Sequence, residues 1–201
     1  MKIGITGPAA SGKTSVAKAF ADKFGINYLE IPTSRYMKEH SLYNHYDILR
    51  YCVNYPREGI KFHESLIKDR FTIMSETPGP WVTDRLSIDS YVYYIIQCSA
   101  WNHDVELNKE LFDISIANLC SVDFVVKYDY SSELMRLDNG KRVLNDSWHM
   151  GYQYILDSLL DKYTDSYRYY TPKDSLNIKV PSIEERVNRL YYTLLDRQLW
   201  K

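Results

Sequence analysis

The sequence predicts an α/β fold with three layers, in which helices flank a parallel sheet, together with a small lid. Two observations predict this class. Short apolar segments typical of buried strands alternate with helical patterns along the 201 residues, and a glycine-rich pattern separates the first strand from the first helix. Ligands of such sheets collect beyond the carboxyl ends of the strands.

The first strand is expected at Lys2 to Ile5, and Gly25 is expected to end the first helix. The apolar positions of that helix are Val16, Ala17, Phe20, Ala21 and Phe24. Later strands are expected at Tyr28 to Ile31, Trp81 to Thr83, Phe124 to Tyr128 and Leu176 to Val180.

Two further helices are well marked. One apolar stripe precedes the third strand and consists of Phe62, Leu66, Ile67, Phe71 and Met74. Ser182 to Glu185 resembles a capping box at the start of the last helix, whose apolar side is Val187, Leu190, Tyr191, Leu194 and Leu195. No internal repeat is visible, so we expect residues 1–201 to form a single domain.

The glycine-rich pattern is G-x-x-x-x-G-K-[ST], the phosphate-binding P-loop, and it predicts a nucleoside triphosphate ligand. Its backbone N–H groups must turn inward around a polyphosphate, and the following helix adds partial positive charge. Lys13 is expected to reach the β- and γ-phosphates, and the Thr14 hydroxyl to bind Mg²⁺. The candidate nucleotide-binding residues are Gly7, Ala10, Ser11, Gly12, Lys13, Thr14 and Ser15.

Charged side chains follow the third predicted strand. Asp84 is a candidate for holding Mg²⁺ or for accepting a hydroxyl proton, and Arg85 for binding a phosphate oxygen whose charge grows during transfer. Asp89 follows them and is a candidate substrate contact. The alternative for the pair is a helix-capping aspartate beside a solvated arginine.

Four segments in this order resemble successive motifs of one group of P-loop kinases. They are the P-loop, Ile31 to Arg35, Asp84 to Tyr91 and Asp138 to Arg142. The group is the AAA-type, kinase-like family that includes the bacterial nicotinamide riboside kinase domain, and the chain also resembles thymidylate and phage deoxynucleotide kinases. The resemblance spans most of the chain and implies a P-loop kinase fold.

One segment departs from the family pattern. The family commonly has Pro-Glu-x-x-Arg after the second strand, whereas this chain has Pro32-Thr33-Ser34-Arg35. The acidic residue near the acceptor is therefore absent, and Asp84 or Glu30 would have to replace it, although Glu30 is equally an edge-strand carboxylate. Arg35 is expected to contact the acceptor, with a solvated arginine as the alternative.

The polar segment from Asp138 to Met150 carries Lys141 and Arg142 and follows Arg136. It is expected to be a lid, over about residues 136–150, that closes on the phosphates and excludes water. An ordinary solvated turn is the alternative.

Composition argues against two classes of protein. The net charge of −1 gives no overall positive field for duplex nucleic acid, and no run approaches the roughly 20 apolar residues of a membrane span. The P-loop begins six residues after Met1, which leaves no room for a secretion signal, so we expect a cytoplasmic protein. A nucleic-acid partner is not favoured, and a homodimer stays open.

Cysteines and histidines show no metal-binding pattern. Cys52, Cys98 and Cys120 are odd in number, unclustered and within apolar patterns, so we expect buried thiols. The histidines are expected to be surface or hydrogen-bonded residues without a ligand cluster: His40, His45, His63, His103 and His149.

We therefore expect a kinase that uses ATP and Mg²⁺ and transfers the γ-phosphoryl group to a nucleoside monophosphate. A monophosphate is preferred because the candidate cations exceed what one triphosphate needs. The candidate catalytic residues are Lys13, Asp84, Arg85 and Arg142, the substrate-binding residues are Arg35, Arg85, Asp89 and Lys141, and the metal ligands are Thr14 and Asp84. The alternatives are a nucleoside kinase, a kinase of a modified base in DNA, and a regulatory nucleotide-binding ATPase.

The lid hypothesis gives a kinetic prediction. Arg142→Ala and Lys141→Ala should lower kcat more than they raise the KM for ATP, because lid cations engage fully only in the closed state. Steady-state kinetics at varied ATP concentration measures both constants. Variants with wild-type kinetics would show that the segment is an ordinary turn.

Overall fold

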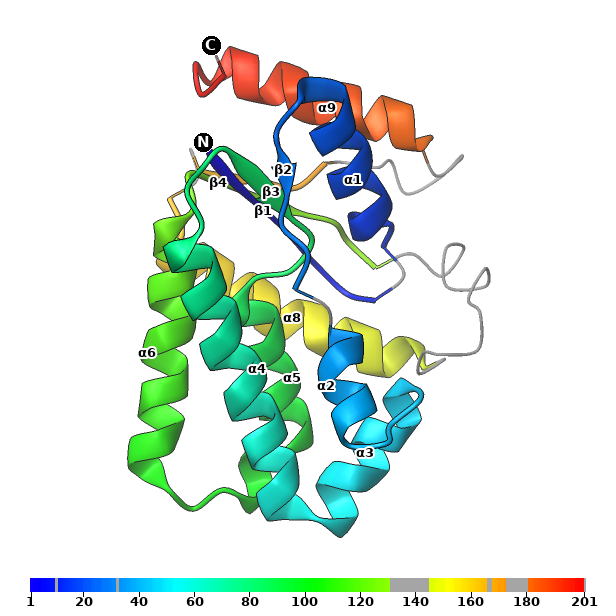
Figure 1. The fold of residues 1–201 in the computed structure, drawn as a ribbon, viewed down its shortest axis with the longest axis vertical. Coiled ribbons are helices and arrows are strands. Elements are labelled where there is room, and N and C mark those ends of the chain that lie inside the picture. Colours follow the sequence, from blue (N-terminus) through cyan, green and yellow to red (C-terminus); the bar gives the residue numbers. More distant parts are fainter. Residues whose placement is uncertain (10, 32, 131–144, 166–167, 173–180, 201) are drawn as a thin grey trace.

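A computed structural model describes residues 1–9, 11–31, 33–130, 145–165, 168–172 and 181–200. Within these ranges, five parallel strands form one sheet in the order β2-β3-β1-β4-β5. The strands are β1 (Lys2–Thr6), β2 (Asn27–Tyr28), β3 (Trp81–Thr83), β4 (Phe124–Lys127) and β5 (Tyr169–Tyr170). Helices cover both faces of the sheet, which confirms the predicted three-layer α/β class (Figure 1).

The described helices differ in what they cover. Helices α1 and α9 pack on one face of the sheet, whereas α4, α5, α6 and α8 pack on the other, and α2 and α3 extend beyond it against α4 (Figure 1). Their bounds are α1 (Lys13–Phe24), α2 (Thr33–Glu39), α3 (His45–Asn54), α4 (Pro56–Glu76), α5 (Ser87–Gln97), α6 (Val105–Ser121), α8 (Asp146–Tyr163) and α9 (Ile183–Asp196), with a 3₁₀ turn, η1 (Ser99–Trp101). Within the described residues, no helix is both long and apolar enough to cross a membrane.

Helix ends follow the local chemistry of the sequence. Gly25 ends α1 with a left-handed φ of 65°, as predicted. Ser182 and Glu185 form the predicted capping box, in which the Ser182 hydroxyl accepts from Glu185 N at 3.2 Å and the Glu185 carboxylate accepts from Ser182 N at 2.7 Å. The apolar stripe on α4 is also confirmed, because Phe62 and Leu66 are buried.

Two strands differ from the prediction. β2 is Asn27–Tyr28 and ends earlier than expected, although Leu29 N still donates to Val82 O at 2.9 Å. β5 is Tyr169–Tyr170, a half-buried pair that shows no apolar run in the sequence. The segment predicted as the fifth strand, Leu176 to Val180, lies outside the described residues.

Part of the predicted lid is helical. α8 begins at Asp146, where the side chain of the N-cap residue Asn145 accepts from Trp148 N at 3.0 Å. The end of the 136–150 segment is therefore the first turn of a helix. Lys141 and Arg142 lie outside the described residues, so the lid itself stays a prediction.

Two leucines of α9 test how this helix is packed. Leu190 is 1% exposed and Leu195 is 37% exposed. Leu190→Ala should lower the free energy of unfolding by about 2–5 kcal/mol because it leaves a cavity against the sheet. Leu195→Ala is the matched control and should cost less than about 1 kcal/mol. Urea unfolding measures both, and equal losses would contradict the described packing.

Candidate active site

The P-loop connects β1 to α1, and its glycines adopt conformations that other residues avoid. Gly7 has a φ of 131°, and a Cβ there would lie 2.2 Å from Tyr128 O. Gly12 has a left-handed φ of 81°. Arg186 on α9 supports the loop because its Nη1 donates to Ser11 O at 2.7 Å. The described part of the loop thus leads into the N-terminus of α1, a position suited to binding an anion.

Lys13 and Thr14 make different contacts at the start of α1. Lys13 Nζ donates to Pro8 O at 2.5 Å and to Ser11 Oγ at 3.1 Å, so its charge lies inside the loop. Thr14 donates its hydroxyl to the carboxylate of Asp84.

Strand register brings Asp84 to the loop. β3 is the direct neighbour of β1, and Thr83 lies opposite Gly4. The residue after Thr83 therefore lies beside the end of β1. Burial and the neighbouring carboxylate of Asp84 raise the pKa of the Tyr28 phenol, so Tyr28 also lies close to Asp84.

The carboxyl group of Asp84 favours its charged form. Burial acts to raise its pKa, but the hydrogen bond from Thr14 and the charges of Arg85 and Lys13 outweigh this, and the pKa lies below its usual value. Asp84 is therefore ionised at neutral pH. A threonine hydroxyl beside an ionised carboxylate is an oxygen donor set suited to Mg²⁺.

Asp89 on α5 connects the loop to the start of α5 and to α8. Its carboxylate is fully buried and accepts from Leu86 N at 2.9 Å, from Tyr152 Oη at 2.7 Å and from Gly7 N at 3.4 Å. Arg85 Nη1 lies 3.4 Å from the same carboxylate. These contacts favour a positioning role for Asp89 over the substrate contact expected from the sequence.

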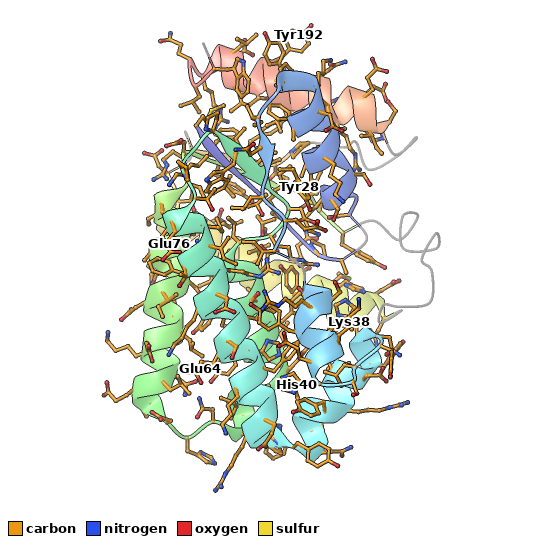
Figure 2. All side chains as sticks on the ribbon, in the orientation of Figure 1. Tyr28, Lys38, His40, Glu64, Glu76 and Tyr192 are labelled. Carbon is orange, nitrogen blue, oxygen red and sulfur yellow. The ribbon has the colours of Figure 1, made fainter. Side chains whose placement is uncertain are left out.

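A cavity of about 620 Å³ begins at the P-loop and continues between the helices beyond the sheet. Its size suits a small organic ligand. One of its lining residues is Lys38, which is labelled on α2 in Figure 2. The lining residues are Ala9, Gly12, Lys13, Thr14, Ser15, Thr33, Ser34, Met37, Lys38, Leu42, Tyr43, His45, Ile48, Phe62, His63, Leu66, Asp84, Arg85, Ser90, Tyr93 and Gln97.

The structure brings together some of the predicted site residues. Gly12, Lys13, Thr14, Ser15, Asp84 and Arg85 line the cavity, whereas Gly7, Ser11 and Asp89 support it from behind. Ala10, Lys141 and Arg142 lie outside the described residues.

Two predicted acceptor contacts lie away from the cavity. Arg35 does not belong to the described cavity wall; its side chain is 73% exposed and pairs with Glu39 at 3.4 Å. Glu30 is also exposed and outside that wall. Lys38, one helical turn after Arg35, lines the cavity instead.

Sequence reasoning missed Arg70. This buried arginine donates from Nη2 to Ile31 O at 3.1 Å and to Thr33 Oγ1 at 3.0 Å, and so fixes the start of α2. Burial, together with the charge of Arg85, lowers the pKa of Arg70. The sequence contained a sign that Arg70 is buried, because it lies four residues after Leu66 and eight after Phe62, on the apolar side of α4.

Cys52 and Cys98 are buried, as predicted, but the structure brings them close to His63, a grouping that the sequence analysis did not predict. Cys52, His63 and Cys98 are all buried, and their ligand atoms lie within 4.8 Å of one another. They come from separate helices, so no sequence spacing marks them. Cys120 was also expected to be buried but is exposed on α6.

Comparisons with solved structures identify the fold. The deoxyadenosine kinase from M. mycoides, solved with the products dCMP and dCDP, matches 98% of this chain and 99% of its own with a TM-score of 0.66 and 13% identity. The NadR protein in complex with NR matches 96% of this chain but 51% of its own, with a TM-score of 0.70 and 13% identity. This chain therefore has the P-loop kinase fold that the sequence motifs implied.

No protein-family model matches the chain, and a search of curated proteins finds no match.

Asp89→Asn tests the buried carboxylate. The amide replaces one acceptor oxygen by a donor, so it cannot accept from Gly7, Leu86 and Tyr152 together, and the free energy of unfolding should fall by about 1–3 kcal/mol or more. Asp113→Asn is the control, since Asp113 is exposed and pairs with Lys109, and it should change stability by less than about 0.5 kcal/mol. Denaturant unfolding compares the two variants, and a neutral Asp89→Asn would refute the positioning role.

Proposed function

We propose that this protein is an ATP-dependent kinase that phosphorylates a nucleoside. The observation that carries the proposal is that Lys13, Thr14 and Asp84 line the same cavity that extends between α2, α3, α4 and α5. A triphosphate on the loop would thus present its γ-phosphoryl group to an acceptor held by these helices. Phosphoryl transfer depends mainly on such positioning and on charge stabilisation.

Each residue of the site has a role in this reaction. Lys13 binds the β- and γ-phosphate oxygens and stabilises the charge that moves during transfer. Thr14 and Asp84 would hold Mg²⁺, which supplies further neutralisation of phosphate charge. Arg85 lies over the ring of Tyr93 at 5.6 Å and faces the same cavity, where it stabilises the phosphoryl group from the acceptor side.

We choose a nucleoside over a nucleoside monophosphate as the phosphoryl acceptor because of where the described arginine side chains lie. Arg35, which was expected to bind an acceptor phosphate, is solvent-exposed and paired with Glu39. Arg85 contacts Asp89 and is assigned above to the transferring phosphoryl group, so it is no separate site for an acceptor phosphate. Similarity over nearly the full length of both chains to a deoxyadenosine kinase supports the same choice. Lys38 in the cavity wall favours the second candidate, a nucleoside monophosphate kinase.

An acceptor screen tests the proposal. ADP release is measured with ribonucleosides, deoxynucleosides, their monophosphates and duplex DNA, and acceptor-free hydrolysis serves as the control. We expect the best nucleoside to exceed its own monophosphate by at least about tenfold in kcat/KM, the effect of roughly 1.4 kcal/mol. Faster monophosphates would promote the second candidate, DNA phosphorylation would indicate a base kinase, and acceptor-independent hydrolysis would indicate a regulatory ATPase.

Lys13→Ala tests the transfer chemistry itself. Loss of this charge should lower kcat by about a hundredfold to a thousandfold, because it acts on the transferring phosphoryl group. Lys18→Ala is the matched control, since Lys18 is an exposed lysine of the same helix, and it should keep near-wild-type turnover. Circular dichroism confirms that both variants are folded. Wild-type turnover in folded Lys13→Ala would refute the kinase proposal.

A further inference from the structure

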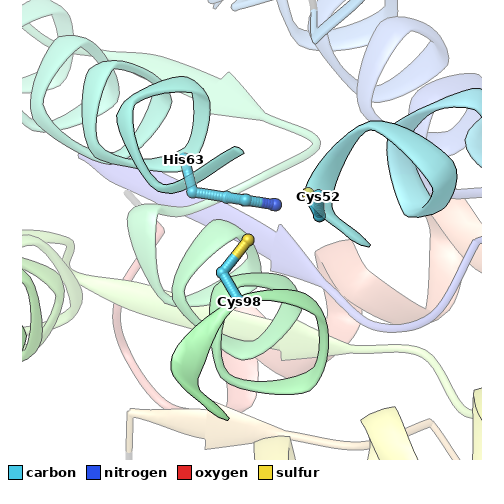
Figure 3. A group of neighbouring side chains, drawn as sticks. All are labelled: Cys52, His63 and Cys98. Atoms are coloured by element: carbon cyan, nitrogen blue, oxygen red, sulfur yellow. The ribbon is translucent and has the colours of Figure 1, made fainter. Parts of the chain in front are cut away.

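Separate helices bring two thiols and an imidazole together beside the cavity. Cys52 lies on α3, His63 on α4, and Cys98 directly follows α5. Their ligand atoms lie within 4.8 Å of one another, and the three residues are 0%, 2% and 1% exposed, respectively. The ring of His63 points from α4 toward the two cysteines (Figure 3). The proposed kinase chemistry uses none of these groups.

The hydrogen bonds of His63 leave one ring nitrogen available. Nε2 lies 2.9 Å from Gln97 Oε1, and because that oxygen only accepts, Nε2 carries the proton. The other ring nitrogen, Nδ1, is buried and has no hydrogen-bond partner among the described residues. Metal-bound histidines use one nitrogen for the ion and donate the other N–H to an oxygen that fixes the ring. Gln97 provides such an oxygen for Nε2, and in the proposed site Nδ1 would bind the ion.

The distances are close to those of a metal site. In a tetrahedral zinc site, bond lengths of about 2.3 Å to sulfur and 2.0 Å to nitrogen place two sulfurs about 3.8 Å apart and sulfur and nitrogen about 3.5 Å apart. The 4.8 Å limit exceeds these separations by about 1 Å. Small side-chain rotations would close the difference. Two thiolates with an imidazole favour zinc over the oxygen-seeking ions Mg²⁺ and Ca²⁺.

We propose that Cys52, His63 and Cys98 bind a zinc ion that joins α3, α4 and the end of α5. A water molecule would complete the tetrahedron, since His63 also lines the cavity. The ion would stabilise the part of the molecule that lies beyond the sheet, where Cys52 and Cys98 belong to a core formed by helices. This proposal does not depend on the identity of the phosphoryl acceptor or on kinase activity.

Metal content and cobalt spectra test the site. The full chain is purified under reducing conditions, stripped with a chelator, reloaded with Zn²⁺ and freed of loosely bound ions. We expect one zinc ion per chain. Loading with Co²⁺ should give thiolate-to-cobalt charge-transfer absorption together with the visible bands of tetrahedral Co²⁺, because sulfur ligands are required for the former.

Variants identify the ligands. Cys52→Ser and Cys98→Ser should each lower zinc affinity by more than about a hundredfold, since even changes outside the first ligands cost about 10- to 100-fold. Cys120→Ser is the matched control and should bind zinc like wild type, because Cys120 is exposed on α6. In this variant only Cys52 and Cys98 can supply a thiolate, so thiolate-to-cobalt absorption would identify them as ligands even where the ligand variants fail to fold.

Three outcomes would overturn the proposal. The first is a reduced, folded chain that retains no zinc and shows no thiolate–cobalt absorption. The second is unchanged zinc affinity in folded Cys52→Ser and Cys98→Ser, which would place the ion elsewhere. The third is a disulfide between Cys52 and Cys98 that persists in the reduced preparation.

Discussion

The buried carboxylate of Asp89 is the group on which the candidate active site depends. It accepts from Gly7 N and from Tyr152 Oη, which are 82 and 63 residues away in the sequence, and from Leu86 N at the start of α5. A buried carboxylate is stable only when its oxygens accept hydrogen bonds. Moving any of these donors away would leave a buried charge without a partner, which costs free energy, so the donors stay in place. The P-loop, the start of α5 and α8 therefore form one unit.

The candidate active site lies where two cores meet. Lys13 and Asp84 are placed by the sheet, because adjacent parallel strands end side by side, whereas the acceptor side of the cavity is placed by helix packing around a separate core. The proposed zinc ion belongs to the helical core, so the two sides of the cavity would be stabilised by different means.

The sequence was most informative where function depends on local spacing. The P-loop and the Asp84-Arg85 pair could be predicted because each needs only one strand end and the residues after it. The position of Arg35 could not be predicted, because which side chains of α2 line the cavity depends on how that helix packs. Arg35 and Lys38 are both exposed, yet only Lys38 is among the described residues that line the cavity. The grouping of Cys52, His63 and Cys98 depends on how α3, α4 and α5 pack. The three residues are separated by 11 and 35 positions in the sequence, and such spacings do not indicate a metal site. β5 was missed because two half-buried tyrosines form no apolar run.

A double-mutant cycle between Asp89 and Tyr152 tests most directly whether one carboxylate unites the site. The free energy of unfolding is measured for wild type, Asp89→Asn, Tyr152→Phe and the double variant. Because the two side chains share a 2.7 Å hydrogen bond inside the protein, we predict a coupling energy of about 1–3 kcal/mol. Effects that add to within about 0.5 kcal/mol would show that Asp89 and Tyr152 act independently, and would contradict the account.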